Sequence, residues 1–557
     1  MNTKIKFGHI TLARSALAIA VVAATTGSAS AMQIDLGNPD IRLRWDNTVR
    51  YNLGVRMENQ DSKIMNNPNF DESSGKFDRG DIVTNRLDIL TEIDLSYKWH
   101  FGARISAAGW YDDAYSDRSV ESNVPGYSTS YDRDRYSSEV ERYVYGPSGE
   151  ILDAFVWANF DLGNTPINVK VGKHTQYWGE GLLFGAHALS YSQAPLDAVK
   201  ASTSPGIETK EVFLPIGQIS AKAQVTDALS ISGQYYYEWD HTRFPFGGTY
   251  FGAADPFFEG PDRLPAAPGF DLRRADSKFG RDSANWGVMA RYDIQSAGAT
   301  IGAYYREFDD YQAWLSPQID MASGQYRLVY PRNVKVYALS YAGNIASASI
   351  GAEVSYRKNG ALNATGVSTV DDQGPRGDTY HMVVNAVYGV PRYWLANNST
   401  LVAEVAFSHL DKVTKHEELF KGRGYNACTD LRTPGVPNSG GKEDGCSTRN
   451  YSAVAVNYTP QYLAILPSWD LDIPLTLNYG LYGNAATAGG GAEGALAWSV
   501  GAKMTYQQRH EFTLRYADVS AQEKNTLNAN GDRMVNGNGN VGGTDRGWLS
   551  FTYRTSF

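Results

Sequence analysis

The chain has 557 residues, a formal net charge of −9 and only two cysteines. The acidic balance argues against a nucleic-acid partner, because such proteins need a basic footprint. No apolar run after position 31 reaches the length of a transmembrane helix, which excludes a helical membrane protein. The negative mean hydropathy does not exclude the membrane, since a membrane-spanning β-strand needs an apolar residue only at every second position.

The N-terminus has the layout of a secretory signal peptide. Basic residues precede a short apolar run over 16–24, and the Ala-Ser-Ala sequence at 29–31 fits a small-residue cleavage pattern. The apolar run is too short for a bilayer, which takes about 20 helical residues to cross. We therefore expect residues 1–31 to be a signal peptide that is removed on export.

Regular alternation of apolar and polar residues dominates the rest of the chain, and no linker divides it. In the segment 41–57 the apolar side chains occupy odd positions and the charged or polar ones even positions. Such alternation is typical of strands whose two faces meet different surroundings. We predict that the odd residues face lipid and the even ones a lumen. Similar runs recur at 229–239, 380–390, 473–481 and 496–506.

Short gaps between the predicted strands alternate with long ones, as in bacterial outer-membrane barrels, where short periplasmic turns alternate with long external loops. The fold predicted for residues 32–557 is therefore an all-β, up-and-down, antiparallel transmembrane barrel in the bacterial outer membrane. The count is about 18 strands, and 16 stays open because boundaries predicted from sequence err by ~2–4 residues. The predicted strands are 41–57, 84–98, 101–115, 150–162, 166–178, 211–225, 228–241, 284–294, 299–313, 332–343, 346–358, 377–390, 399–412, 449–464, 471–483, 492–507, 510–520 and 546–557.

Charged residues at the even positions of the first two strands would line the lumen, which is aqueous in a barrel of this size. The expected lumen charges are Arg42, Arg44, Arg50, Arg56, Asp88, Glu92 and Asp94. One interpretation is a charged ladder that steers permeant ions. The other is ion pairing between strands, which lets polar side chains fill a wet interior.

The third long gap, 179–210, holds a compact apolar stretch that an external loop has no reason to carry unless it packs against something. We predict that this loop folds into the lumen and narrows the pore; the alternative is an apolar patch outside the barrel. The residues expected at the constriction, in contact with a permeant, are Trp178, Glu180, Leu182, Leu183, Phe184, Leu189 and Tyr191.

The stretch from Val171 to Glu180 contains Lys-x-x-x-x-Trp-Gly-Glu. This motif, the opening strand 41–48 and the segment 85–89 resemble a proteobacterial outer-membrane family catalogued as domain of unknown function number 1302. The resemblance spans the predicted mature chain and implies an outer-membrane barrel. Members are often encoded with a second exported family and a resistance-nodulation-division type inner-membrane transporter, in settings that degrade hydrophobic compounds. The resemblance therefore implies a periplasmic partner and an inner-membrane transporter, but no particular functional residues.

Cys428 and Cys446 lie in the same long gap, 413–448, which the topology places outside the cell. Two cysteines in an exported chain most simply pair, so we expect a disulfide.

Catalytic and metal-binding motifs are not found, so we expect no enzyme, cofactor or metal site. The predicted function is an outer-membrane pore for uptake or export of hydrophobic or amphipathic small molecules or lipids. One alternative is a general porin, selective for anions through its arginines. Another is an outer-membrane hydrolase, which the strand count disfavours because catalytic barrels are small and filled. The expected partners are outer-membrane lipid, lipopolysaccharide and, because the chain ends in an alternating strand with Phe557, the barrel-assembly machinery.

Overall fold

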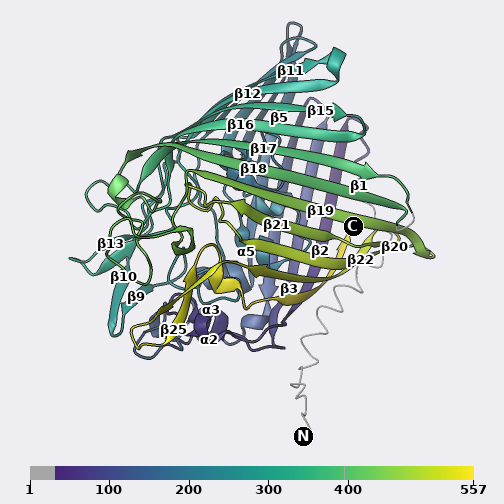
Figure 1. The fold of residues 1–557 in the computed structure, drawn as a ribbon. Coiled ribbons are helices and arrows are strands. Elements are labelled where there is room, and N and C mark those ends of the chain that lie inside the picture. Colours follow the sequence, from purple (N-terminus) through teal and green to yellow (C-terminus); the bar gives the residue numbers. More distant parts are fainter. Residues whose placement is uncertain (1–31, 394–395) are drawn as a thin grey trace.

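The computed structural model describes residues 32–393 and 396–557, so the predicted signal peptide lies outside the described residues. These residues form a closed antiparallel β-barrel (Figure 1). Its main sheet has 20 strands, of which β1 (Met32–Ile34) is a short addition to the edge of β2, while β20 and β21 are two halves of one wall strand. The wall therefore has 18 strands, and the predicted fold is confirmed.

Consecutive wall strands pair with each other, and the last pairs with the first from Thr48 opposite Ser556 to Arg56 opposite Trp548. Closure gives the backbone N–H and C=O groups of the first and last strands hydrogen-bond partners. These partners are required because hydrocarbon offers none. The wall strands are β2 (Ile41–Arg56), β3 (Ile82–Tyr97), β4 (Phe101–Asp112), β5 (Ser148–Leu162), β6 (Thr165–His174), β7 (Ile216–Gln224), β8 (Leu229–Tyr236), β11 (Trp286–Ile294), β12 (Ala299–Phe308), β15 (Val334–Ile345), β16 (Ala348–Ala361), β17 (Arg376–Val390), β18 (Asn398–Lys415), β19 (Asn450–Leu466), β20 (Trp469–Asp472) with β21 (Leu475–Tyr482), β22 (Leu496–Tyr506), β23 (His510–Ser520) and β26 (Trp548–Ser556).

Some strand ends differ from the prediction. β6 ends at His174 rather than at 178, and β7 begins at Ile216 rather than at 211, because the chain between them leaves the wall to enter the lumen. The strand predicted at 471–483 is split around Pro474, whose nitrogen cannot donate to the sheet. The carbonyl of Pro474 still accepts from the amide of Gly501 at 3.0 Å, so the wall stays continuous.

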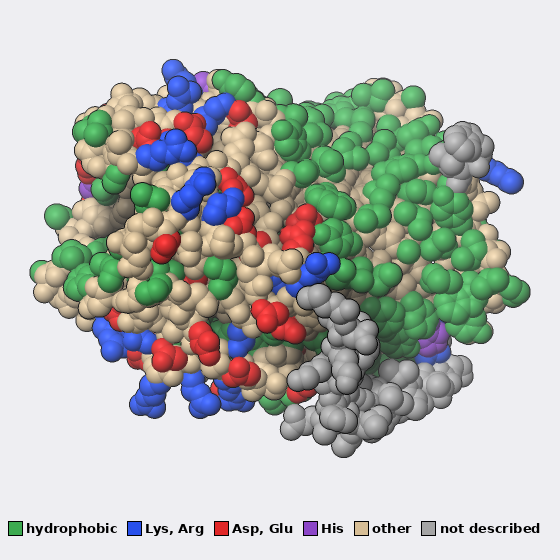
Figure 2. All heavy atoms as spheres, turned by 60° about the horizontal axis from the view of Figure 1, so that its bottom comes forward, with side chains coloured by type: hydrophobic (Ala, Val, Ile, Leu, Met, Phe, Trp, Pro, Cys, Tyr) green, Lys and Arg blue, Asp and Glu red, His purple; other side chains and the backbone are tan. Residues whose placement is uncertain are grey.

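The predicted orientation of the first strand holds. Arg50 and Asn52, at even positions, donate hydrogen bonds to Ser204 of the loop inside the barrel. Trp45, at an odd position, is on the outer surface. Figure 2 shows a similar division on one face of the molecule: hydrophobic side chains gather on one side of the view, and charged ones on the other.

The long connections carry short helices and two small sheets, and they gather at one end of the barrel (Figure 1). No helix within residues 32–393 and 396–557 is long and apolar enough to cross a membrane. The helices are α2 (Ser62–Met65), α3 (Asp71–Gly75), α4 (Ser138–Val140), α5 (Ala198–Thr203) and α6 (Thr209–Val212), and the small sheets are β9 (Arg263–Ala267), β10 (Phe270–Arg274), β13 (Gln318–Asp320) and β14 (Gln325–Arg327), and β24 (Glu523–Leu527) with β25 (Arg533–Gly537).

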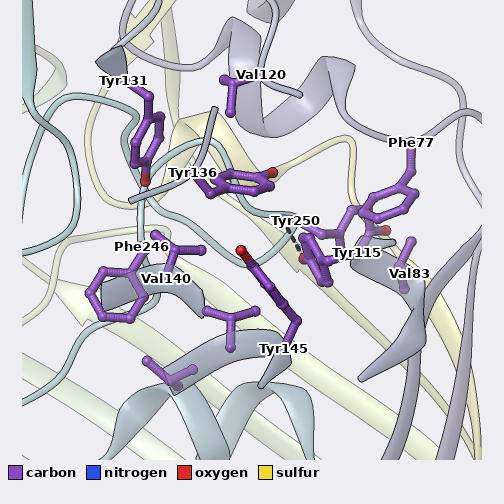
Figure 3. Close-up of a cluster of buried hydrophobic side chains, with 12 residues drawn as sticks. Phe77, Val83, Tyr115, Val120, Tyr131, Tyr136, Val140, Tyr145, Phe246 and Tyr250 are labelled. Atoms are coloured by element: carbon purple, nitrogen blue, oxygen red, sulfur yellow. Dashed lines mark hydrogen bonds between the residues drawn. The ribbon is translucent and has the colours of Figure 1, made fainter. Parts of the chain in front are cut away.

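An aromatic cluster joins these loops into a cap over the external end (Figure 3). Tyr115, Tyr131, Tyr136 and Tyr250 are buried together, and Tyr131 and Tyr136 donate to the carbonyls of Gly247 and Gly248 at 2.6 Å. Aromatic rings bury large apolar surfaces and their hydroxyls find partners inside the cap. The cap is therefore a packed core of its own at the external end of the barrel.

Three buried carboxyl groups lie beside this cluster. Asp255 accepts from the amides of Glu72 (2.9 Å) and Ser73 (3.0 Å), while Asp71 accepts from the amide of Asn123 at 2.6 Å. Burial, together with the charge of Asp255, raises the pKa of Asp71 to about 7 from the ordinary 3.8. Burial also raises the pKa of Glu72 and Asp255.

The first prediction concerns the pH dependence of the cap. Because the pKa of Asp71 is raised in the closed cap, opening releases its proton between about pH 4 and pH 7, and the stability that the proton gives is lost as pH rises through this range. The protection factors of residues 61–75, which are exchange rates corrected for the intrinsic pH dependence of amide exchange, should therefore be higher at pH 5 than at pH 8. Asp71→Asn, which keeps an acceptor oxygen, should reduce this difference. An unchanged pH dependence in the variant would contradict the assignment.

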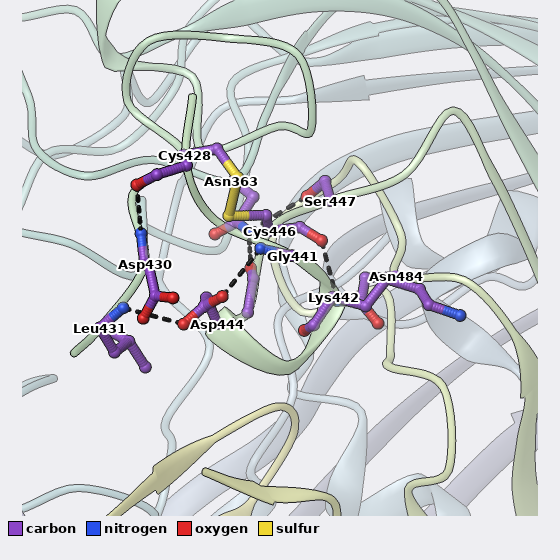
Figure 4. Close-up of a disulfide and its surroundings, with 12 residues drawn as sticks. Asn363, Cys428, Asp430, Leu431, Gly441, Lys442, Asp444, Cys446, Ser447 and Asn484 are labelled. Carbon is purple, nitrogen blue, oxygen red and sulfur yellow. Dashed lines mark hydrogen bonds between the residues drawn. A yellow bond between two sulfur atoms is a disulfide. The ribbon is translucent and has the colours of Figure 1, made fainter. Parts of the chain in front are cut away.

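Cys428 and Cys446 form a disulfide in the long loop between β18 and β19 (Figure 4). Both cysteines are fully buried, and their Cα atoms are 5.7 Å apart. Asp444 accepts from the amides of Leu431 (2.9 Å) and Gly441 (2.8 Å) beside the bond. The bond therefore fixes the shape of an external loop and does not join wall strands.

The second prediction concerns this disulfide. Replacing both cysteines by serine should leave the barrel folded, because the bond closes a short loop and contributes about 3 kcal/mol at most. The loop 416–449 should become sensitive to limited proteolysis, while the heat-dependent gel shift of the barrel should stay as in the wild type. Loss of that gel shift in the serine variant would show that the bond supports the wall instead.

Candidate functional site

The segment 175–215, hereafter the inner loop, crosses the lumen. After β6 its amides bond to Glu353 of β16 and Glu404 of β18. It then returns to the first strands, where Ser204 donates to Asp88 at 2.6 Å and Glu211 accepts from Arg50 at 2.5 Å. The third external loop thus folds inward, as the sequence predicted.

The Trp-Gly-Glu-Gly sequence forms the entry of the inner loop. Gly179 has φ +98°, and a Cβ there would lie 2.4 Å from a carboxylate oxygen of Glu353. A Cβ on Gly181 would lie 2.4 Å from the Cβ of Ala188. Only glycine fits these two positions, because each combines a close approach with no room for a side chain. The motif therefore turns the chain out of β6 and brings it against the far wall.

Two wall carboxylates hold the loop in place. Glu404 accepts from the consecutive amides of Leu182 (2.6 Å), Leu183 (2.9 Å) and Phe184 (2.5 Å). Glu353 accepts from the amides of Glu180 (2.7 Å) and Leu189 (2.5 Å). Hydrogen bonds to a charged group contribute roughly 1.5–3 kcal/mol each when buried. The pair of carboxylates is therefore the main polar attachment of the tip of the inner loop.

A histidine pair lies deeper under the same tip. His187 Nδ1 is 3.0 Å from His381 Nδ1, and His187 Nε2 is 2.7 Å from the carbonyl oxygen of Gly490. A carbonyl only accepts, so Nε2 of His187 carries the proton and its Nδ1 accepts from His381. Burial lowers the pKa of His187 to about 4, so this histidine is neutral at physiological pH.

Packing separates the predicted contact residues into two groups. Trp178, Phe184 and Leu189 are 3%, 8% and 1% exposed, and they pack against the wall. Burial removes them from contact with a permeant while the loop is docked, so their expected role in contact does not fit this conformation. Leu182 is 53% exposed and Leu183 borders a cavity in the lumen.

The two polar members of the predicted set hold the loop. The guanidinium of Arg357 lies over the ring of Tyr191, with its Cζ 3.9 Å from the ring centre. The hydroxyl of Tyr191 donates to the carboxylate of Asp310 at 3.3 Å. Glu180 lies 3.4 Å from Arg291. Both side chains therefore have partners on the wall or on the neighbouring loop.

The predicted lumen arginines do not form a free cationic ladder. Arg50 pairs with Glu211 at 2.5 Å and Arg44 with Asp46 at 2.6 Å. Arg56 is buried in the cap against the carbonyl of Phe77 and the carboxylate of Asp545, and Arg42 lies over the ring of Trp99 in a periplasmic turn. Of the four, Arg42 and Arg56 are thus at the two ends of the barrel and not along its lumen.

The predicted acidic residues are paired as well. Asp88 bonds to Arg86 at 2.9 Å, Glu92 bonds to Arg104 and to Lys210 of the inner loop, and Asp94 lies 3.5 Å from Arg104. These charges are therefore paired with one another, which matches the second of the two interpretations given for the lumen charges, ion pairing between strands.

Two of the cavities formed by the described residues lie in the lumen. The inner chamber, of about 360 Å³, lies between the inner loop, the loop 237–285, the loop 521–547 and the wall from β19 to β26. The vestibule, of about 560 Å³, opens at the periplasmic end and is lined mainly by charged side chains. The lining of the chamber includes Leu183, Tyr250, Phe251, Arg515, Asp518, Arg546 and Trp548. The lining of the vestibule includes Arg44, Glu92, Glu208, Lys210, Glu511 and Arg554.

Sequence reasoning missed Glu353, Glu404, His187 and His381. All four are polar side chains on lumen-facing or loop positions. The glutamates accept from backbone amides of the inner loop, and the two histidines contact each other across distant segments. Alternation reveals which face such a residue occupies but not which distant segment it meets. In the part of the chain that the structure describes, no group of three or more His, Cys, Asp or Glu side chains is arranged to hold a metal ion.

Comparison with solved structures gives weak similarities over nearly the whole chain. OccAB4 of Acinetobacter baumannii is 8% identical, with a TM-score of 0.42 and coverage of 94% of this chain and 99% of that one. The outer membrane channel DcaP of Acinetobacter baumannii is 9% identical, with a TM-score of 0.37 and coverage of 95% and 100%. OpdK of Pseudomonas aeruginosa, solved with vanillate, is 10% identical, with a TM-score of 0.39 and coverage of 92% and 98%.

No curated protein matches the chain. The closed barrel, its apolar outer face and its alternation of short turns with long loops are those of an outer-membrane pore. One family model, described as "Protein of unknown function (DUF1302)", matches residues 12–557. The chain therefore belongs to the DUF1302 family.

Proposed function

We propose that this outer-membrane pore conducts hydrophobic or amphipathic small molecules, lipids included. The observation that carries the proposal is the composition of the inner chamber, where Leu183, Phe251 and Trp548 meet polar wall residues. A constriction for ions or sugars would instead favour opposed charges at the narrowest point. An apolar ligand would gain roughly 25 cal/mol for each Å² that it buries there, before ordering costs.

The sequence resemblance supports the same proposal, because it implies pathways for hydrophobic carbon sources. Such compounds need a protein route, since the lipopolysaccharide leaflet obstructs apolar solutes. A signal peptide at 1–31, a periplasmic partner and an inner-membrane transporter are parts of this proposal that the resemblance or the sequence pattern suggests. The rival is a general anion-selective porin, and the pairing of Arg44 and Arg50 with carboxylates weighs against it.

The third prediction tests the chamber with a pair of neighbouring leucines. Leu183→Asn should lower the uptake of an apolar probe into proteoliposomes about fivefold, because the chamber loses the apolar surface of a half-buried leucine. Leu182→Asn is the matched control: Leu182 lies beside Leu183 but does not line the chamber. Equal uptake by both variants and the wild type, together with a large, steady, anion-selective conductance, would favour the general porin.

The fourth prediction tests the attachment of the inner loop. Glu404→Ala removes the acceptor of three amides and should shift the docked loop toward an undocked state by about tenfold or more. Planar-bilayer recordings should then show larger and noisier currents than the wild type. Glu307→Ala, on the outer rim beside Lys335, should leave the currents unchanged. Identical recordings from both variants would show that the loop does not limit the pore.

A further inference from the structure

One cation in the inner chamber has no counterion. Arg515 lies in the middle of β23 and lines the chamber. Its guanidinium makes no hydrogen bond or ion pair with any residue that the structure describes, and its Nε is buried without an acceptor. Ser550 donates to the backbone carbonyl of Arg515 at 3.2 Å, which holds the strand but leaves the guanidinium unsatisfied.

Other guanidinium groups along the lumen have at least one acceptor, although a buried Nε without a partner also occurs in Arg104, Arg306 and Arg554. Arg104 pairs with Glu92, Arg291 with Glu180, and Arg554 with Glu208 and Glu511. Arg546, which also borders the chamber, donates to the carbonyls of Tyr250, Gly252 and Gly542 and is therefore occupied within the cap. A partly buried charge without a partner is costly, so a site of this kind favours an anion supplied from outside.

Small neighbours leave space around Arg515. Gly501 is its direct partner on β22 and Ser550 its partner on β26. A Cβ at Gly501 would lie 3.5 Å from the Cβ of Arg515, and it would also lie 3.3 Å from Cγ of Pro474, so the glycine leaves the side of Arg515 free of a neighbouring side chain on β22. The guanidinium can therefore present its planar, forked set of donors to a ligand in the chamber.

Apolar groups surround the rest of the chamber. Phe251 and Trp548 pack edge to face with ring centres 4.9 Å apart, and Leu183 and Tyr250 border the same space. Asp518 also lines the chamber, and it forms no ion pair with Arg515. Its charge would oppose a second anionic group on a ligand. The combination fits a molecule with one anionic group and an apolar body.

We propose that Arg515 binds the carboxylate of a permeant that is otherwise apolar, while Leu183, Phe251 and Trp548 hold its apolar body. The inference rests on the proposed function and makes it more specific: the substrate class is the apolar monocarboxylic acids. Arg515 would select such acids over neutral molecules of the same shape, because the neutral molecule leaves the guanidinium unpaired.

A matched pair of probes tests the inference. Adamantane-1-carboxylate and the neutral adamantane-1-carboxamide share one rigid apolar body, and both can be followed by the interruptions that they cause in single-channel currents. The wild type should bind the carboxylate about tenfold more tightly than the carboxamide. Arg515→Gln should abolish this preference without changing the affinity for the carboxamide, and Arg515→Lys, which keeps the charge but not the fork, should retain part of it.

Controls separate this inference from the proposed function. Arg118→Gln removes an arginine from an external loop, where it pairs with Glu141, and should keep the full preference. The heat-dependent gel shift confirms that each variant is folded. If the wild type binds both probes equally and Leu183→Asn weakens the binding of both, the proposed pore for apolar molecules stands without the role of Arg515. Equal binding by the wild type, or a preference that survives in Arg515→Gln, overturns the role of Arg515. If the wild type binds neither probe, both proposals fail.

Discussion

The lumen of this barrel is shaped by one kind of interaction, the hydrogen bond from inner-loop amides to wall carboxylates. Glu404 accepts hydrogen bonds from three consecutive amides of the loop tip. Glu353 accepts two more, one from each end of the same tip. Backbone amides inside a barrel need acceptors, and residues 180–184 of the inner loop lie in no helix or strand. Two wall carboxyl groups accept from these amides at the place where the loop meets the wall. The apolar packing of Phe184 and Leu189 follows from this placement, and so does the position of the chamber.

Charged groups are arranged differently in two parts of the barrel interior, the region around the inner loop and the chamber. Most lumenal arginines near the inner loop are paired, whereas the chamber combines aromatic rings with one unpaired guanidinium. Ion pairs fill space and hold the loop, and such pairs leave little net field to attract small ions. The cap lies at the external end, the chamber lies beside it against the wall from β19 to β26, and the charged vestibule lies at the periplasmic end. This order suits a molecule with an apolar body and one charged group, which would leave the chamber toward a polar exit.

The sequence predicted the barrel well and its interior only in part. Alternation over 41–57 and at the C-terminus follows directly from the two-sided environment of a strand, so the number and order of strands could be read from it. The ends of β6 and β7 could not be predicted from alternation, because the residues beyond His174 continue a strand-like pattern while the chain turns inward. The apolar stretch of the inner loop predicted packing, but exposure divides it: Leu183 borders the chamber and Leu189 is buried. The partners of Glu404 and the lack of one for Arg515 depend on contacts between distant segments, which no local pattern encodes.

The docked position of the inner loop is the central claim, and a distance measurement in the membrane tests it most directly. Spin labels at Ala186, on an exposed part of the loop tip, and at Val405, on the lipid-facing side of β18, would report the loop relative to the wall. Double electron–electron resonance in lipid nanodiscs should give one narrow distance distribution that matches the docked loop. A broad distribution, or one centred on distances that place Ala186 outside the barrel, would contradict the account.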